Sequence, residues 1–222
     1  MWTEKYRPES LSEYRGASSE KKDLKKHIEK WEQGDKAVLL HGQAGTGKTS
    51  LVQALANDLG YELVETNASD VRTKSKLKSE LKEATRQASF IGGKKLILID
   101  EVDGMSGNSD RGGVKEIGTI VDETRFPIVM TANDAYDNSI RSLRNKAKTI
   151  ELGSVHTNSI AAFLRDILDE EGIEYEDGVP KRIARQAGGQ MRSAINDLEA
   201  IARGKERITK DDMDVMGQRD KR

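Results

Sequence analysis

The stretch that decides the fold reads Gly42-Gln43-Ala44-Gly45-Thr46-Gly47-Lys48-Thr49 and matches the pattern G-x-x-x-x-G-K-[ST]. The apolar run Ala37–His41 before it is typical of a buried strand. Residues 50–59 after it have the apolar spacing of a helix, which Gly60 ends. Glycines in such a loop let backbone N–H groups approach phosphate oxygens, and the helix N-terminus adds partial positive charge. The stretch therefore predicts a site for a nucleoside triphosphate, most simply ATP.

Two side chains of this loop have predicted roles. Lys48 can reach the β and γ phosphates, which makes it a catalytic candidate, and the hydroxyl of Thr49 can bind Mg²⁺. A glycine-rich turn with an incidental lysine is the alternative, but it does not explain the strand and the helix on either side. The predicted ATP-binding residues here are Gly42, Gln43, Ala44, Gly45, Thr46, Gly47, Lys48, Thr49 and Ser50.

An acidic pair follows a second apolar run. Residues 96–99 read Leu-Ile-Leu-Ile and precede Asp100 and Glu101, at a strand end where open α/β sheets place their ligands. Asp100 is predicted to hold the water shell of Mg²⁺, and Glu101 to be the general base for the attacking water. Such acids are often merely solvated when they stand alone. Asp103 is a weaker candidate, whose alternative role is only to cap the next turn.

Two further side chains are candidate contacts to the γ-phosphate, and both belong to the predicted catalytic and ATP-binding sets. A third apolar run, residues 127–131, leads to Asn133, whose amide could hydrogen-bond the γ-phosphate or the attacking water. Without the other motifs Asn133 would be a turn residue. Arg192 stands at the start of a predicted helix, and it could reach a phosphate only if the second part of the chain folds over the first.

The strand signals stop near residue 152. Further strands are expected at residues 61–67 and 149–152, so that strands and helices alternate over this part of the chain. Beyond it no strand signal is found, and helical periodicity covers residues 160–171, 179–187 and 191–202. We therefore predict an α/β nucleotide-binding domain with a parallel sheet over residues 1–152, and a small all-helical domain over residues 153–222.

Composition and charge exclude several classes of protein. Lys plus Arg number 37 and Asp plus Glu 38, so the net charge of -1 gives no global argument for nucleic acid binding. The absence of cysteine excludes disulfides and thiolate metal sites, and the three histidines lack ligand spacing. No segment approaches the ~18 consecutive apolar residues of a membrane span. We expect a cytoplasmic protein that makes no membrane contact.

These elements, in this order, resemble the AAA+ ATPases, in which a small helical lid domain follows a P-loop nucleotide-binding core. More specific segments are similar to replication factor C, the clamp loader of archaea and eukaryotes, and the resemblance covers essentially the whole chain. They are Trp2-Thr3-Glu4-Lys5-Tyr6-Arg7-Pro8, Asn67-Ala68-Ser69-Asp70, Asp100-Glu101-Val102-Asp103, Ala132-Asn133-Asp134 and Gly188-Gly189-Gln190-Met191-Arg192-Ser193-Ala194-Ile195-Asn196-Asp197.

The resemblance implies that Tyr6, Arg7 and Pro8 lie beside the adenine, that Asn133 is the sensor 1 residue and that Arg192 is the sensor 2 arginine. It implies ATP and Mg²⁺ as cofactors. It also implies clamp-loader small subunits, a sliding clamp and primer–template DNA as partners in a hetero-oligomeric ring. The expected function is to open the clamp and load it onto DNA during replication, in the cytoplasm at the nucleoid.

One departure from the family concerns an arginine that small subunits offer to a neighbour's ATP site. Their Ser-Arg-Cys motif corresponds here to Asn145-Lys146-Ala147, so this finger is absent. Together with Asp110-Arg111-Gly112-Gly113, the departure resembles the archaeal large subunit, although Arg141 or Arg144 could still act on a neighbour. The family's C-terminal collar is not in the sequence. We therefore expect an ATPase fragment that binds ATP but turns it over weakly without neighbouring subunits.

The resemblance also suggests surfaces for DNA and for the clamp. Arg72, Thr73, Lys74 and Lys76 are the candidate DNA contacts, and residues 105–121 are a candidate clamp-facing surface. By itself the basic run is more often a solvated helix face, because glutamates follow on the same helix.

Two alternative functions stay open. One is another AAA+ DNA-processing ATPase, such as a helicase loader or a Holliday-junction motor, which would lack the replication factor C segments. The other is a nucleotide-dependent binding switch with little hydrolysis.

Overall fold

The computed structural model describes residues 1–68, 93–105 and 111–217. Their contacts divide the chain into two compact units. The first, which we call the sheet unit, contains Pro8–Gln43 and Lys48–Gly153. The second, the helical unit, contains Met1–Arg7, Ala44–Gly47 and Ser154–Arg222. The sheet unit ends at Gly153, one residue from the predicted domain boundary at residue 152.

The sheet unit is built on five parallel strands in the order β2-β3-β4-β1-β5. Every residue of β1 and β4 is buried, as expected for strands covered on both faces. The predicted parallel α/β sheet is thus confirmed, with bounds that shift by no more than two residues. The strands are β1 (Ala37–His41), β2 (Glu62–Asn67), β3 (Lys95–Asp100), β4 (Ile128–Ala132) and β5 (Ala147–Glu151).

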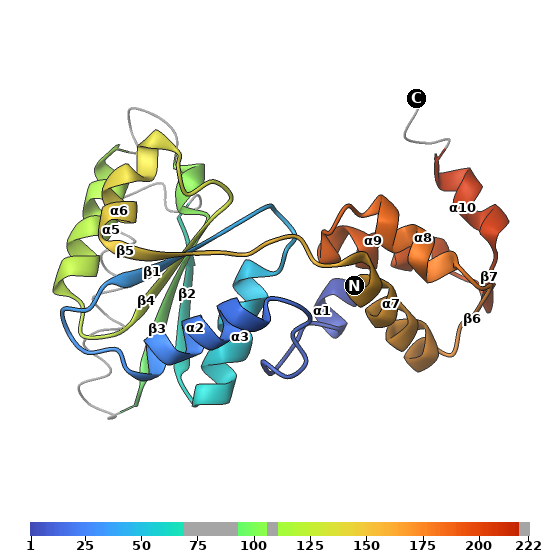
Figure 1. Ribbon diagram of the computed structural model, residues 1–222, viewed down its shortest axis with the longest axis horizontal. Helices are drawn as coiled ribbons and strands as arrows, with labels where there is room; N and C mark the ends of the chain where they lie inside the picture. Colours follow the sequence, from blue (N-terminus) through green and yellow to red (C-terminus); the bar gives the residue numbers. More distant parts are fainter. Residues whose placement is uncertain (69–92, 106–110, 218–222) are drawn as a thin grey trace. The chain divides into compact units, whose positions relative to one another are not determined.

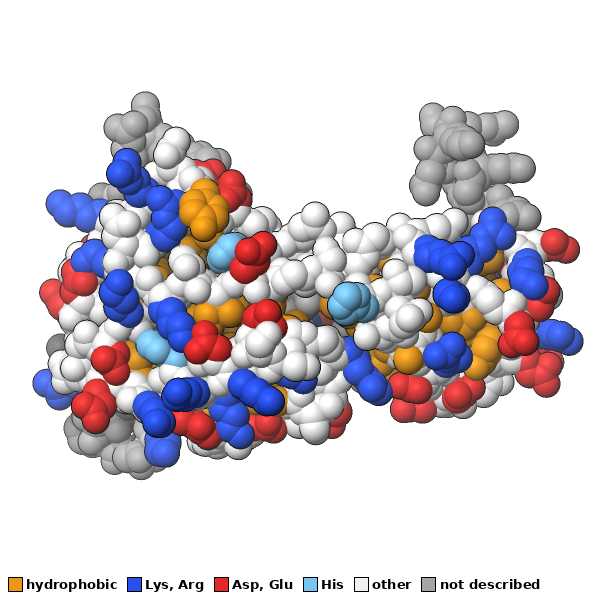
Figure 2. Space-filling model, viewed as in Figure 1, with side chains coloured by type: hydrophobic (Ala, Val, Ile, Leu, Met, Phe, Trp, Pro, Cys, Tyr) orange, Lys and Arg blue, Asp and Glu red, His pale blue; other side chains and the backbone are white. Residues whose placement is uncertain are grey.

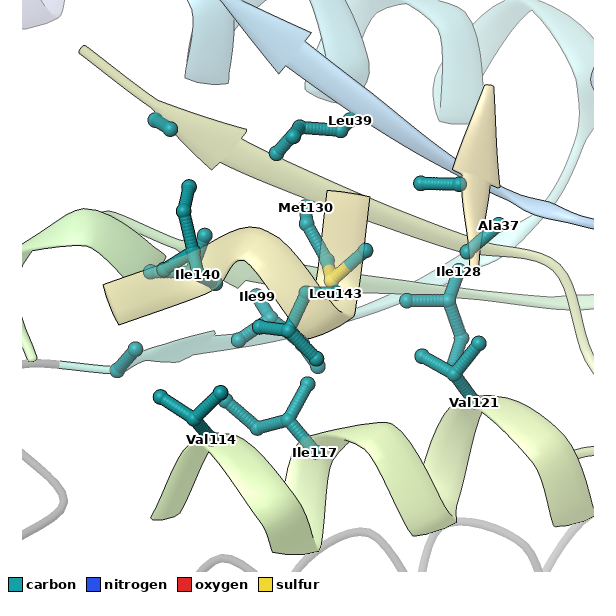
Figure 3. Close-up of a cluster of buried hydrophobic side chains, with 14 of the residues drawn as sticks. Ala37, Leu39, Ile99, Val114, Ile117, Val121, Ile128, Met130, Ile140 and Leu143 are labelled. Atoms are coloured by element: carbon teal, nitrogen blue, oxygen red, sulfur yellow. The ribbon is translucent and has the colours of Figure 1, made fainter. Parts of the chain in front are cut away.

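Helices cover both faces of this sheet (Figure 1). One face packs on α2 (Ser18–Glu29) and α3 (Lys48–Leu59) through a core that includes Leu24, Leu51 and Val38. The opposite face packs on α5 and α6 through a second core (Figure 3). Side chains alternate between faces along each strand, so Leu39 joins the second core while its neighbours join the first. The elements on the second face are α5 (Arg111–Glu123), α6 (Arg141–Asn145) and the 3-10 turns η1 (Val102–Gly104) and η2 (Asn138–Ile140).

The helical unit has its own core, formed by Leu164, Ile183, Leu198 and their neighbours. It also contains a pair of two-residue parallel strands, β6 and β7, which the sequence did not predict because two residues carry no periodicity. The elements are α1 (Trp2–Lys5), α7 (Thr157–Glu171), β6 (Glu174–Tyr175), α8 (Val179–Gln186), α9 (Met191–Ala202), β7 (Arg207–Ile208) and α10 (Lys210–Gly217).

The first seven residues belong to the helical unit, whereas the predicted range 1–152 placed them with the sheet. Trp2 and Tyr6 pack against the helical core, and the backbone N–H of Trp2 donates to Glu199 Oε2 at 2.9 Å. This packing joins residues almost two hundred positions apart. Local sequence patterns carry no information about it.

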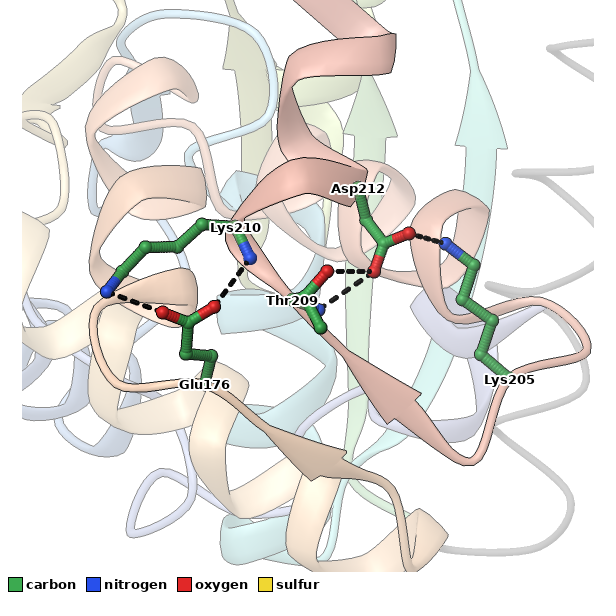
Figure 4. A network of polar contacts seen from close by, with 5 residues as sticks. All are labelled: Glu176, Lys205, Thr209, Lys210 and Asp212. Atoms are coloured by element: carbon green, nitrogen blue, oxygen red, sulfur yellow. Dashed lines mark hydrogen bonds and ion pairs between the residues drawn. The ribbon is translucent and has the colours of Figure 1, made fainter.

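Polar contacts attach α10 to the rest of the helical unit (Figure 4). The carboxylate of Asp212 accepts hydrogen bonds from the N–H and the hydroxyl of Thr209, and Lys205 pairs with it at 2.5 Å. Glu176 accepts from the N–H of Lys210 and also pairs with its ammonium group. These bonds satisfy N–H groups at the start of α10 that have no partner inside the helix.

The surface is strongly charged and mixed in sign. On the face shown in Figure 2, Lys and Arg side chains are interspersed with Asp and Glu, and hydrophobic side chains show only as small areas. This agrees with the near-zero net charge of the sequence. None of the helices within residues 1–68, 93–105 and 111–217 is long and apolar enough to cross a membrane.

Candidate nucleotide-binding site

The glycine-rich loop leaves the carboxyl end of β1 and enters α3 at Lys48. Gly42 has φ +147°, and a Cβ atom at this position would lie 2.2 Å from the backbone oxygen of Leu152. Its N–H donates to the carbonyl of Ala132 on the neighbouring strand at 3.3 Å. Only glycine fits both the backbone angle and the space, so the path of the loop depends on it.

Lys48 is 8% exposed, and its ammonium group uses all three of its donors. Nζ lies 2.7 Å from the carbonyl of Gly42, 3.0 Å from that of Gln43 and 3.0 Å from the Oδ1 atom of Asn133. Two residues that the sequence singled out separately are therefore in direct contact. The buried cation stands where the loop, the start of α3 and the end of β4 meet.

The hydroxyl of Thr49 and the carboxylate of Asp100 form a second contact between predicted site residues. Thr49 Oγ1 donates to Asp100 Oδ2 at 3.0 Å. The other carboxylate oxygen accepts a short hydrogen bond from the hydroxyl of Thr131 on β4. Asp100 is thus held by two hydroxyl groups, one from the start of α3 and one from the adjacent strand, which fixes the plane of its carboxylate.

Glu101, the predicted base, has an unusual backbone conformation. Its φ of 55° and ψ of 49° lie in the left-handed region, which costs a residue with a Cβ atom about 1–2 kcal/mol. Its N–H donates to Thr131 Oγ1 at 3.0 Å, and its Oε2 accepts from Asn67 Nδ2 at 3.3 Å. The conformation turns the chain sharply after β3 and leaves the glutamate exposed at the carboxyl edge of the sheet.

Asp103 makes contacts beyond those of a turn cap. Its Oδ2 atom accepts hydrogen bonds from the backbone N–H groups of Asn133 at 2.8 Å and Asp134 at 3.1 Å. The segment after β3 and the segment after β4 are therefore tied together. This contact fixes the backbone of Asn133, whose side chain meets Lys48.

The tip of the loop, Ala44–Gly47, belongs to the helical unit, as does Arg192 in the first turn of α9. The backbone N–H of Arg192 donates to the carbonyl of Gly45 at 3.4 Å. A Cβ atom on Gly45 would come within 3.5 Å of the Cβ atom of Arg192. The arginine predicted from sequence therefore stands next to the loop tip within this unit.

Tyr6 and Arg7, which the resemblance places beside the adenine, have partners in the helical unit. The Tyr6 hydroxyl donates to Glu171 Oε1 at 2.7 Å, and Lys5 pairs with the same oxygen at 2.6 Å. The hydrogen bond from Lys5 holds the pKa of Glu171 below its ordinary value, and burial raises the pKa of Tyr6. Arg7 pairs with Glu4 at 2.7 Å. Their contact with a base stays a prediction, as does that of Pro8.

Two of the residues considered for contacts with neighbouring subunits, Lys146 and Arg144, have partners inside the sheet unit. Lys146, at the place of the missing arginine finger, forms an ion pair with Asp122. Arg144 donates to the carbonyl of Ala135 at 2.8 Å and lies 5.1 Å from the ring of Tyr136, which is 72% exposed. The DNA candidates Arg72, Thr73, Lys74 and Lys76 lie outside the described residues, as do residues 106–110 of the suggested clamp surface.

Two residues with contacts in the site, Asn67 and Thr131, were not among the site residues expected from the sequence, and the contacts of Asp103 were not foreseen. Thr131 had a usable signal, because it is a hydroxyl residue within an otherwise apolar run, two positions before Asn133. Asn67 stood in a segment that was noted for its resemblance alone. These contacts depend on which strands are neighbours, and that information is not in the local sequence.

The oxygen ligands of this site suit a hard cation that brings further ligands with it. Among the residues that the structure describes, no group of three or more His, Asp and Glu side chains is arranged to hold a metal ion by itself. Thr49 and Asp100 offer two oxygens. Mg²⁺ commonly takes one or two protein oxygens and completes its shell with phosphate oxygens and water.

Comparison with known proteins agrees with this geometry. The chain is 50% identical over 205 residues to the replication factor C large subunit of Methanococcus aeolicus, an alignment that covers 91% of this chain and 43% of that protein. It is 43% identical over 222 residues to that of Haloarcula marismortui, and this alignment covers 99% of this chain and 43% of that protein. It is 45% identical over 223 residues to that of Halobacterium salinarum, an alignment that covers 99% of this chain and 47% of that protein. The chain therefore spans less than half the length of these curated relatives.

The comparison with protein families concerns the part of the chain that carries the site. The family described as "ATPase family associated with various cellular activities (AAA)" matches residues 38–153, more than half of the chain. The match begins in β1 and extends through the glycine-rich loop, the acidic pair at the end of β3 and Asn133 after β4. The chain belongs to this AAA family of ATPases.

Proposed function

We propose that this chain is the ATP-binding and ATP-hydrolysing part of a clamp-loader large subunit, which opens a sliding clamp and loads it onto primer–template DNA. The identity of 43–50% to proteins named replication factor C large subunit, over 91–99% of this chain, supports the proposal. Membership in the AAA family supports the ATPase part independently. The clamp, the small subunits and the DNA are the partners that the proposal requires.

The observation that carries the proposal is the meeting of Lys48, Thr49 and Asp100 with Asn133 at one edge of the sheet. The ammonium group of Lys48 neutralises charge on the β and γ phosphates, and backbone N–H groups of residues 42–49 hold the phosphate oxygens. Thr49 and Asp100 would hold Mg²⁺, because their oxygens are hard ligands and lie 3.0 Å apart. Bound Mg²⁺ would supply charge neutralisation at the phosphates.

The remaining residues have separate roles in nucleotide binding and hydrolysis. Glu101 orients the attacking water and accepts its proton. Asn133 hydrogen-bonds the γ-phosphate or this water, and Arg192 is the candidate for a further phosphate contact. Tyr6, Arg7 and Pro8 contact the adenine. A neighbouring subunit supplies the arginine that completes the site, and such arginines raise phosphoryl-transfer rates by ~10³ or more.

Nucleotide titrations test the first part of the proposal. Isothermal titration of this chain with ATP in the presence of Mg²⁺ is expected to show binding to one site. Single-turnover assays are expected to show that hydrolysis is slow. No binding of ATP, ADP or a non-hydrolysable analogue at millimolar concentration would refute the nucleotide site. Fast turnover by the monomer would refute the dependence on a neighbour.

Reconstitution tests the clamp-loader part. The chain, and a version extended at its C-terminus to the length of its relatives, are mixed with archaeal replication factor C small subunits, a sliding clamp and primed DNA. ATP-dependent assembly and a rise in ATPase rate with the clamp and DNA are the expected results. If the extended version neither assembles nor responds to the clamp, another AAA+ DNA-processing ATPase becomes the better assignment.

A further inference from the structure

Thr131 is the single polar residue of β4, whose sequence is Ile-Val-Met-Thr-Ala, and it is fully buried. It lies opposite Leu40 of β1, between the strand that enters the glycine-rich loop and the strand that ends in Asp100. Its hydroxyl contacts Asp100 and Glu101 and so spans both acidic residues of the proposed site.

The chemistry of the two partners fixes the direction of both hydrogen bonds. A backbone N–H can only donate, so the hydroxyl oxygen accepts from Glu101. An ionised carboxylate can only accept, so the hydroxyl proton points to Asp100 Oδ1. One hydroxyl is thereby used as donor and acceptor at once, and neither partner can exchange roles with the other.

Both bonds act on geometry that hydrolysis would need. The bond to Asp100 complements the one from Thr49, so that each carboxylate oxygen has a hydroxyl donor. The bond from Glu101 supports a residue in the left-handed region, which persists in a non-glycine residue only when its surroundings enforce it. The side chain of Thr131 is itself restricted, because a branched Cβ in a buried strand leaves few rotamers.

We infer that Thr131 is a positioning residue, whose hydroxyl sets the orientation of the Asp100 carboxylate and of the Glu101 backbone for hydrolysis of the bound nucleotide. The inference rests on the proposed function of the site. Thr131 does not touch the nucleotide. It acts through the two acids. Such support affects the rate because catalytic groups must be held within a fraction of an ångström of their productive positions.

The test compares Thr131→Val with Thr131→Ser. Valine keeps the branched shape and loses the hydroxyl, whereas serine keeps the hydroxyl and loses a methyl group. We expect single-turnover ATP hydrolysis by Thr131→Val to be slower by roughly 10- to 100-fold. Its affinity for ADP without Mg²⁺, which depends on the loop, should stay within about threefold of wild type. Thr131→Ser should restore hydrolysis to within about fivefold.

Thr124 offers a matched control in the same unit. It is also a buried threonine whose hydroxyl donates one hydrogen bond and accepts another, in this case to the backbone carbonyl and from the backbone N–H of Phe126. Thr124→Val therefore also removes one donated and one accepted hydrogen bond, but away from the site. Its hydrolysis rate should equal that of wild type, even if its melting temperature falls as much as that of Thr131→Val.

The outcomes separate this inference from the proposed function. If wild type neither binds nor hydrolyses ATP, the proposed function fails. If wild type hydrolyses ATP and a folded Thr131→Val does so equally fast, only the role of Thr131 is refuted. If circular dichroism shows that valine prevents folding, Thr131→Ala replaces it. Equal hydrolysis by the alanine and serine variants would then refute the role, and slow hydrolysis by alanine alone would support it.

Discussion

The ammonium nitrogen of Lys48 lies 3.0 Å from the amide oxygen of Asn133, although 85 positions separate the two residues. Lys48 is the first residue of α3, and Asn133 follows β4. They meet because β4 pairs directly with β1, whose end leads into the glycine-rich loop. A γ-phosphate held by Lys48 would therefore also lie within reach of Asn133, and this proximity underlies the first prediction.

Replacing Lys48 by alanine should weaken ATP binding by roughly 10- to 100-fold, the usual range for losing hydrogen bonds from a charged donor. The loop carbonyls of Gly42 and Gln43 also lose their partner. Isothermal titration with ATP and Mg²⁺ measures the change. Lys148→Ala is the control, since Lys148 is a surface lysine paired with Asp23 at 2.5 Å. An unchanged affinity in Lys48→Ala would contradict the assigned site.

Replacing Glu101 by glutamine should reduce hydrolysis by roughly 10²- to 10³-fold while ATP affinity stays within about threefold, because the amide cannot accept the proton of the water. Rates are measured in the complex reconstituted with the small subunits, clamp and DNA. Glu151→Gln, at the exposed end of β5, serves as control. If the complex turns over ATP equally well with Glu101→Gln, Glu101 is not the base.

Two glycines separate the effect of backbone angle from that of space. Gly34 has φ +102° with nothing near its missing Cβ, whereas a Cβ on Gly42 would lie 2.2 Å from the backbone of Leu152. Gly34→Ala should cost about 1 kcal/mol of unfolding free energy and Gly42→Ala roughly 3 kcal/mol or more. Urea unfolding measures both. Equal costs would show that the loop can move away from Leu152.

Acid should loosen the attachment of α10. The hydrogen bonds from Lys205 and Thr209 lower the pKa of Asp212 from 3.8 to about 2, and Lys210 lowers the pKa of Glu176 (Figure 4). A lowered carboxyl pKa stabilises the fold fully above about pH 4, and this stabilisation is lost as the pH falls towards 2. Thermal unfolding followed by circular dichroism between pH 6 and 2.5 measures the effect.

Asp212→Asn is the comparison for this experiment. The variant should be less stable than the wild type at pH 6, and the difference should shrink below pH 4, because the asparagine does not titrate. Curves that stay parallel down to pH 2.5 would show that the Asp212 contacts do not contribute to the acid sensitivity.

Much of the fold could be predicted because its signals are local. The strands β1, β3 and β4 are apolar runs bounded by loops, and helices such as α9 show their buried face as a repeat along the sequence. The two-residue strands β6 and β7 were missed because they are too short to show a pattern. The contacts of Trp2 and Tyr6 with α9 and α7 had no signal in the sequence, because their partners are distant along the chain.

The candidate site was predictable residue by residue but not as an arrangement. The spacing of the glycines around Lys48, and the acids that end an apolar run, marked the loop and the pair Asp100 and Glu101 without any structure. The sequence contained no sign that Asp103 would bind the backbone of Asn133, or that Asn67 would face Glu101. Those contacts arise from the order and register of parallel strands.

Sequence by itself therefore determined that this protein has a phosphate-binding loop, an acidic strand end and an α/β sheet, because each of these is written in consecutive residues. Only the tertiary structure decided that Lys48 meets Asn133 and that the buried hydroxyl of Thr131 holds both Asp100 and Glu101. The physical reason is the pairing of β4 between β1 and β3. It brings together side chains that local periodicity leaves unconnected.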